Sequence, residues 1–376
     1  MFSEKKVWVG YYIAILLFMM TTGITSSFGA AAPELPQYKS VDELYAALAK
    51  LPFDQRQAAI LAGALKEGKI VTYEANTEES IGPVFKGFEK KYPGMEVEFF
   101  RTVAEEIVVK AMTEVQAGRW IWDTVSIGSA YGPLMKAKAL ANHQRLFPDN
   151  KIPKQFEGDY WFGTELQPLI IAYNTNLLKA SAAPKSYMEL IEPQWKGKVS
   201  IDTGPENLLV AMLKKWGTAK TENWLDKLVN DNRSLLRKGH TTQTKLLIAG
   251  EFPVAAEVYA YKVAQMVNED NAPIKMVVPA DLCEGEIPPL GISSHAPHPY
   301  AALLWMQYLM SPEGQEIFSR SGPIPIHPDV KPVFPELQQF LDNVDRLVVI
   351  GAGDEEHFAE SGKLIKQYIQ PRIRSN

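Results

Sequence analysis

Short apolar runs alternate with amphipathic stretches through the first half of the chain. Residues 70–74, 95–100 and 121–127 are strand-like runs, and each of the first two is followed by apolar positions at helical spacing. Gly118 ends the second of these predicted helices. Such alternation predicts βα units built around a largely parallel sheet.

A second series of the same kind begins with a strand-like stretch at residues 164–174. Residues 198–202 and 253–258 are further apolar runs, and helical spacing again follows each of them. The chain has 376 residues, whereas a single hydrophobic core usually stops growing at about 250–300 residues. We therefore expect an α/β protein with two lobes.

The first 32 residues have the order of a secretory signal peptide. Lys5 and Lys6 precede an uncharged apolar run at 7–20, and small residues follow up to Ala32. The run is short for a bilayer core of about 30 Å, and an uncleaved membrane anchor is the alternative. We expect residues 1–32 to be removed on export to the periplasm.

Residues 33–68 are expected to form a helical extension ahead of the first lobe. Ser40 with Glu43, and Asp54 with Gln57, have the spacing of capping boxes, and Gly68 stops the second helix. We interpret the extension as a cap packed on the first lobe. A partner-docking arm is the alternative.

Composition and motifs narrow the classes of function. Cys283 is the only cysteine, so no intrachain disulfide is possible, and 39 basic against 44 acidic residues, scattered along the chain, give no footprint for nucleic acid. The chain contains no H-E-x-x-H, G-x-S-x-G, phosphate-loop or paired C-x-x-C motif. His295 and His298 alternate with prolines, which favours a turn that starts a helix over a metal site. These features indicate a protein that is not an enzyme.

Polar turns come directly after predicted strands and before predicted helices. In open α/β sheets, ligands bind beyond the carboxyl ends of the strands, where free helix N–H groups favour anions. Ordinary helix capping is the alternative for any one residue taken alone. The candidate ligand-binding residues of these turns are Asn76, Thr77, Ser80, Ser126, Gly128, Ser129, Tyr131, Thr203, Gly204, His240, Thr241 and Thr242.

Several segments, taken in order along the chain, resemble a known family. Residues 171–175 read Ile-Ala-Tyr-Asn-Thr, residues 294–302 read Ser-His-Ala-Pro-His-Pro-Tyr-Ala-Ala, and residues 308–318 read Tyr-Leu-Met-Ser-Pro-Glu-Gly-Gln-Glu-Ile-Phe. Shorter matching segments stand at 116–119, 123–125, 183–186, 193–198 and 249–253. The set resembles bacterial extracellular solute-binding proteins of the ferric-ion-binding type.

This resemblance implies the type II periplasmic binding fold. Two lobes, each with a parallel-type sheet and helices on both faces, would be joined by two hinge crossings near 164–171 and 277–289 and would close around a ligand. Lobe one would comprise residues 69–167 and 279–345, lobe two residues 168–278, and residues 346–376 would form a C-terminal tail helix. The protein would be a monomer that delivers a small-molecule or metal ligand to an ABC transporter permease in the inner membrane.

The resemblance also implies a ligand set, from which this chain departs. Iron-binding members hold Fe³⁺ by two neighbouring tyrosines, often a His and a Glu, and a small anion. Here the tyrosines of the corresponding segment are Tyr259 and Tyr261, one residue apart, with Glu257 before them, whereas Thr77 and Gly128 stand where the His and the Glu would fall. Residues two apart on a strand face the same side, so both tyrosines are expected to face the ligand.

Two ligands stay open on this basis. Ferric iron would need Tyr259 and Tyr261 as metal ligands, with Glu257 or a captured anion supplying further oxygen. A small organic or phosphorus-containing anion would instead be held by the helix N-termini. No resident cofactor is expected, and Fe³⁺ with a synergistic anion would be cargo.

Two other classes of protein are weighed against the binding protein. A secreted α/β hydrolase would need an acid and a base, for which Glu257 and His240 are the best candidates. A ligand-sensing domain would keep an uncleaved anchor. We expect binding without turnover.

Overall fold

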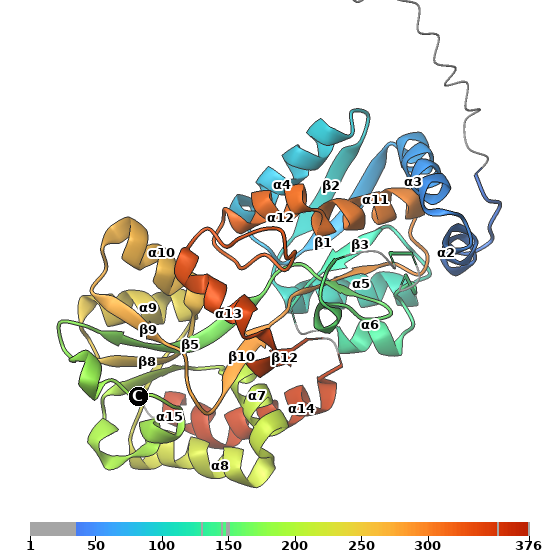
Figure 1. Ribbon diagram of the computed structural model, residues 1–376. Coiled ribbons are helices and arrows are strands. Elements are labelled where there is room, and N and C mark those ends of the chain that lie inside the picture. The colour runs from blue at the N-terminus through green and yellow to red at the C-terminus, as the bar shows by residue number, and fades with distance from the viewer. Residues whose placement is uncertain (1–34, 129–130, 144–145, 148–150, 352, 375–376) are drawn as a thin grey trace, which may run out of the picture. The chain divides into compact units, whose positions relative to one another are not determined.

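The computed structural model describes residues 35–376 except 129–130, 144–145, 148–150, 352 and 375–376 (Figure 1). The expected signal peptide at 1–32 and the candidate residue Ser129 lie outside the described residues. Contacts group residues 35–376 into one unit. Among the described residues, none of the helices has the length and the apolar character needed to cross a membrane.

The first sheet has five strands, and its parallel part comes from the first βα units. Its order is β2 (Glu96–Arg101), β1 (Lys69–Glu74), β3 (Thr124–Ser126), β11 (Pro289–Ile292) and β4 (Phe162–Gly163). β1 pairs parallel with β2 and β3, whereas β11 runs antiparallel to β3 and β4. The flanking helices are α4 (Glu78–Lys91), α5 (Ala104–Gln116), α6 (Gly132–Lys136), α11 (Pro299–Met310) and α12 (Pro312–Ser319).

The second sheet is mixed in the same way. Its order is β12 (Leu347–Ile350), β10 (Cys283–Glu286), β5 (Gln167–Asn174), β8 (Val254–Tyr259), β6 (Val199–Asp202) and β7 (Leu235–Arg237), and β9 (Ile274–Val277) also pairs with β5. β6 is parallel to β7 and β8, and β5 is antiparallel to β8, β9 and β10. The prediction of a largely parallel sheet did not anticipate these antiparallel strands. The helices around this sheet are α7 (Glu206–Trp216), α8 (Thr218–Asp226), α9 (His240–Ala249), α10 (Ala260–Asp270), α14 (Glu355–Leu364) and α15 (Gln370–Arg374).

The chain passes between the two sheets more than once. It leaves the first sheet at residues 164–166, returns at 287–288, and enters the second sheet again at β12. Residues 283–286 therefore form a strand of the second sheet, although the sequence assigned them to lobe one, and the expected tail helix at 346–376 begins with the strand β12. The exact limits of the two lobes stay a prediction.

The extension forms two helices, α2 (Val41–Ala49) and α3 (Phe53–Glu67). The Ser40 hydroxyl accepts a hydrogen bond from Glu43 N at 3.2 Å, which confirms the first capping contact. The second capping box was wrong, because α3 already begins at Phe53 after Pro52 and has no side-chain cap. Gly68 ends α3 in the left-handed conformation with φ 74°, as predicted.

Helix α3 lies along α11, which comes more than 200 residues later in the chain (Figure 1). All residues of α11 except Gln307 are buried, so this helix has no polar face of its own. At Gly63 the two helices approach so closely that a Cβ atom would lie 2.3 Å from Tyr300 Cγ. Glycine is therefore required by space at this crossing.

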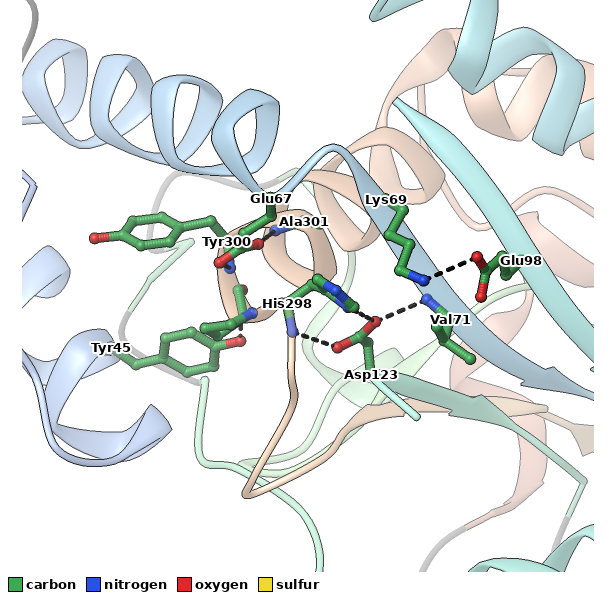
Figure 2. Close-up of polar contacts among 10 residues, drawn as sticks. Tyr45, Glu67, Lys69, Val71, Glu98, Asp123, His298, Tyr300 and Ala301 are labelled. Atoms are coloured by element: carbon green, nitrogen blue, oxygen red, sulfur yellow. Dashed lines mark hydrogen bonds and ion pairs between the residues drawn. The ribbon is translucent and has the colours of Figure 1, made fainter. Parts of the chain in front are cut away.

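Hydrogen bonds of Glu67 and Tyr45 connect the extension to the start of α11; we call these contacts the clamp. The N-cap residue of α11, His298, makes no side-chain cap hydrogen bond. The Glu67 carboxylate accepts hydrogen bonds from the N–H groups of Tyr300 at 3.3 Å and Ala301 at 2.7 Å, and the Tyr45 hydroxyl donates to the carbonyl of Pro299 (Figure 2). Glu67 thus caps a helix that belongs to another part of the chain.

A second polar contact holds the loop before α11 (Figure 2). Asp123 is fully buried and accepts hydrogen bonds from the backbone N–H groups of Val71 at 2.7 Å and His298 at 2.6 Å, and from the ring nitrogen Nδ1 of His298 at 2.9 Å. The carboxylate raises the pKa of His298. His295 stacks instead on Trp120, with ring centroids 4.1 Å apart. The two histidines therefore have separate structural partners, in keeping with the predicted turn.

Candidate functional site

The two candidate tyrosines lie at the junction of β8 and α10. Tyr259 is the last residue of β8, and Tyr261 lies in the first turn of α10. Helical spacing was predicted to follow the strand at 253–258, and α10 does begin at Ala260; only the further expectation that both tyrosines face one side of a strand was wrong. Their ring centroids are nevertheless 5.5 Å apart. The strand-to-helix turn brings the two phenols together.

The backbone just before this junction is strained. Glu257 has φ 59°, a left-handed conformation that is unfavourable for a residue with a Cβ atom, and the register between β5 and β8 shifts beside it. Bulges of this kind re-aim the side chains that follow. Tyr261 also needs room, since a Cβ atom at Gly322, whose φ is 116°, would lie 2.7 Å from its Cδ2 atom.

A carboxyl group that the sequence did not suggest lies beside the tyrosines. Glu286 ends β10, and its interactions with the side chains of Tyr259 and Asn207 act to lower its pKa. A Cβ atom at Gly128 would lie 3.2 Å from Glu286 Oε1. Glu286 therefore fills the space beside the position where the resemblance led us to look for a glutamate. Burial raises the pKa of Glu286 to about 7.

Glu165 is the other carboxylate of this region, and it lies in the crossing between β4 and β5. It is 1% exposed, and it accepts hydrogen bonds from the side chains of Thr164 and Gln167. Burial, and to a smaller extent the nearby charge of Glu286, raises its pKa to about 8. The pKa of Tyr261 is raised to about 12 by burial and then by the charges of Glu165 and Glu286. We call Tyr259, Tyr261, Glu165 and Glu286 the tyrosine–carboxylate cluster.

His240 borders this cluster from the start of α9. Its ring is 5.0 Å from that of Tyr259, between centroids, and its Nδ1 atom is 2.9 Å from the carbonyl oxygen of Glu257. Burial lowers the pKa of His240, which favours the neutral imidazole. With the Nδ1 proton directed at the carbonyl, Nε2 is the nitrogen with a free lone pair for a metal.

Carboxylates alone would not make a metal centre here. Within the described part of the chain, no group of three or more His, Cys, Asp or Glu side chains has the arrangement that could hold a metal ion. Metal binding at this place therefore depends on phenol oxygens. Phenolate and carboxylate oxygens are the hard donors that ferric iron favours.

The helix N-termini are occupied by side chains of the protein itself. Asp202 accepts hydrogen bonds from Gly204 N at 2.8 Å and from Gly239 N at 2.5 Å. Glu257 Oε1 accepts from Leu208 N at 3.2 Å in the first turn of α7. The amides expected to hold an anion thus already have carboxylate partners.

At α4 and its neighbours the candidate residues mostly cap and pack. Thr77 is the N-cap of α4 and accepts from Ser80 N, as in ordinary capping. The Asn76 amide donates to the carboxyl group of Glu74 and to the hydroxyl of Ser126, each at 3.5 Å, and burial raises the pKa of Glu74 to about 8. Tyr131 is fully buried and donates its hydroxyl to the carbonyls of Val125 and Pro289, which makes it a packing residue.

The remaining candidates divide between backbone contacts and solvent. Thr203 donates its N–H to the carbonyl of Arg237, and Thr241 and Thr242 are exposed in the first turn of α9. Of the residues singled out in the sequence, the structure brings together Tyr259, Tyr261, His240 and Gly128, the last through its contact with Glu286.

The acid–base pair considered for a hydrolase does not form. His240 contacts the backbone carbonyl of Glu257, not its carboxyl group. Glu257 Oε2 and both carboxyl oxygens of Glu284 are buried and have no hydrogen-bond partner among the described residues. Burial raises the pKa of Glu257 well above its ordinary value, which favours an uncharged acid. The geometry offers no activated nucleophile or base at this pair.

Comparison with known proteins relates this architecture to one family. A family model described as bacterial extracellular solute-binding protein matches residues 130–343. The chain is 24% identical over 193 residues to iron uptake protein A2 of Synechocystis sp., and this match covers 47% of the chain and 55% of that protein. The chain spans little more than half the length of two of the curated relatives it matches.

Two solved structures illustrate the likeness in three dimensions. The ferric binding protein from Campylobacter jejuni is 19% identical, with a TM-score of 0.67, and the match covers 80% of this chain and 99% of that one. The periplasmic binding protein AfuA from Actinobacillus pleuropneumoniae, solved with fructose-6-phosphate, is 20% identical, with a TM-score of 0.61 and coverages of 80% and 97%. At these identities the likeness concerns the fold, and it confirms the two-lobed α/β architecture expected from the sequence.

Proposed function

Because the chain belongs to the bacterial extracellular solute-binding proteins, we propose that it captures ferric iron in the periplasm and delivers it to an ABC importer in the inner membrane. The oxygens of Tyr259, Tyr261 and Glu286 would bind the metal, with Glu165 and His240 as further candidate ligands. The protein would bind its cargo without chemical turnover. Export by a cleaved signal peptide at 1–32 is part of the proposal.

One observation carries the choice of cargo. Glu286 reaches the space beside Gly128 and interacts with Tyr259, whose ring lies 5.5 Å from that of Tyr261, so one carboxyl group and two phenols gather at one place. Ferric iron is a hard, triply charged cation, and anionic oxygen is the donor it prefers. The pKa of both tyrosines is raised without a metal, and a bound cation inverts that effect by stabilising the phenolate.

An organic or phosphorus-containing anion is the second candidate, and AfuA, solved with a sugar phosphate, supports it. The acidic side chains around the tyrosine–carboxylate cluster disfavour an anion as cargo. Glu165 and Glu286 face the tyrosines, and Asp202 already bonds the amides of Gly204 and Gly239. An anion would need donors that are in use and would meet carboxylates at close range. The names of two of the curated relatives, which refer to iron, support the cation as well.

Ferric loading of the purified mature protein tests the proposal. Protein stripped of metal is mixed with ferric citrate, desalted, and measured by metal analysis, native mass spectrometry and visible absorption. We expect one iron per chain and a red colour from tyrosinate bound to iron. Tyr259→Phe and Tyr261→Phe should each weaken the band, and the double variant should remove it.

The control is Tyr368→Phe on the C-terminal segment, where the hydroxyl bonds Glu222 at 2.8 Å. This variant loses one phenol but should keep the full band and the same iron content. A wild-type protein that stays colourless and free of metal after loading would refute the choice of iron. A band that survives in the double tyrosine variant would refute the site.

A further inference from the structure

Asp202 holds together two turns that begin different helices. It ends β6, and its carboxylate bonds Gly204 N ahead of α7 and Gly239 N ahead of α9. An ordinary N-cap serves only the helix that it precedes. The Asp202 carboxylate therefore stands where a small anion would bind between two helix N-termini.

A second acidic side chain, that of Glu257, meets the first turn of α7. Glu257 Oε1 accepts from Leu208 N, while its Oε2 atom is buried and has no hydrogen-bond partner among the described residues. Asp202 is 7% exposed, and its charge acts on both Glu257 and His240. The donors that an anionic solute would require are thus taken by two acidic side chains, and the Asp202 carboxylate itself takes two of them.

We propose that Asp202 is a specificity-determining residue that excludes anionic solutes from the tyrosine–carboxylate cluster. The Asp202 carboxylate accepts hydrogen bonds from both amide donors and repels a second anion. The site therefore discriminates against an anionic ligand by an unfavourable contact with it. The inference rests on the proposed capture of a cation and goes beyond it by naming the residue that rejects phosphates and carboxylates. Removing the carboxylate leaves two N–H groups for which a small anion is the natural substitute.

The test compares wild type with Asp202→Ala in titrations with inorganic phosphate and, separately, with formate. Sodium chloride of the same ionic strength serves as the reference. We expect Asp202→Ala to bind phosphate or formate at least tenfold more tightly than the wild type in calorimetry. We also expect its thermal unfolding midpoint to rise with either anion, whereas that of the wild type stays unchanged.

Asp226→Ala is the matched control, because Asp226 is exposed and its carboxylate accepts a hydrogen bond from the side chain of Asn230, with no backbone amide bonded to it among the described residues. It changes the net charge equally but frees no backbone amide, so it should gain no affinity. If Asp202→Ala does not fold, Asp202→Asn carries the test, since one side-chain oxygen remains to accept one amide; it should show a smaller gain. Equal anion binding by wild type and the folded Asp202 variant, or an equal gain in Asp226→Ala, would overturn the inference.

The two proposals fail in different ways. A wild type that takes up no iron while Asp202→Ala gains phosphate affinity would remove iron as cargo and leave anion exclusion standing. A wild type that takes up iron while the folded Asp202 variant gains no anion affinity would remove the role of Asp202 alone. A metal-free wild type that itself binds phosphate would overturn anion exclusion and favour the anion as cargo.

Discussion

Replacing Glu67 by glutamine should remove one part of the pH dependence of folding. Burial raises the pKa of Glu67 from 4.5 to about 7 in the folded protein, although the amides of Tyr300 and Ala301 act in the opposite direction. The folded state then binds the proton more tightly than the unfolded state. Stability from this group is fully present below pH 4.5 and is lost as the pH rises to about 7.

The magnitude follows from the same shift. Each pH unit inside that window costs at most about 1.4 kcal/mol, so the whole window gives an upper bound of about 3 kcal/mol. Because part of the side chain reaches solvent, we expect about 1–2 kcal/mol. His298 also has a raised pKa, and its contribution falls with rising pH as well. It is present in both proteins and largely cancels in their difference.

Urea unfolding of wild type and Glu67→Gln at pH 5, 6, 7 and 8 measures the effect. The stability of Glu67→Gln relative to wild type should increase with pH. Glu316→Gln, which changes an exposed glutamate on α12, is the control, and its difference from wild type should stay constant. A Glu67→Gln difference that is the same at pH 5 and pH 8, or that changes in the opposite direction, would show that the reasoning about this clamp is wrong.

Four further substitutions test packing and hydrogen bonds elsewhere in the fold, each by urea unfolding. Asp123→Ala leaves three hydrogen-bond donors without their buried acceptor and should cost about 3–5 kcal/mol, so a loss below about 1 kcal/mol would contradict its role. Gly63→Ala places a Cβ atom against the Tyr300 ring and should lower the free energy of unfolding by about 1–3 kcal/mol. An unchanged urea midpoint would show that the ring moves aside without cost. Gly362→Ala in α14 has open space around the new atom and should instead stabilise by about 0.5–1 kcal/mol, and a destabilised protein would speak against it. Tyr131→Phe should cost about 1 kcal/mol while ferric loading stays unchanged, and lost loading would return Tyr131 to the list of ligands.

The sequence predicted local structure better than it predicted contacts across the chain. Strand and helix positions follow from apolar periodicity, and the cap at Ser40 follows from a spacing of three residues, because both depend on neighbours in sequence. The second capping box was wrong because Asp54 has the right spacing, yet Pro52 lets the helix start earlier. Strand β12 was missed because its pairing with β10 is more than 60 residues distant.

The candidate site shows the same limit. The tyrosine pair was found in the sequence, but its geometry was assigned to strand alternation, whereas the helix start at Ala260 produces it. Glu286 and Asp202 were missed because their partners come from other segments: Glu286 meets Gly128 only through the fold, and Asp202 meets Gly239 across two strands. Acidic residues at the ends of otherwise apolar strands were the available signal.

Helix α11 has consequences for any attempt to shorten this protein. A surface helix normally has a polar side toward water and an apolar side toward the core, but α11 is buried at every position except Gln307, because α3 covers the side that would otherwise face water. The orientation of α11 therefore depends on residues of α3 as well as on its own, and the two helices lie far apart in the sequence. A protein that starts after Gly68 would expose a hydrophobic helix and lose its surrogate cap, and self-association, rather than a slightly weaker monomer, is the expected fate.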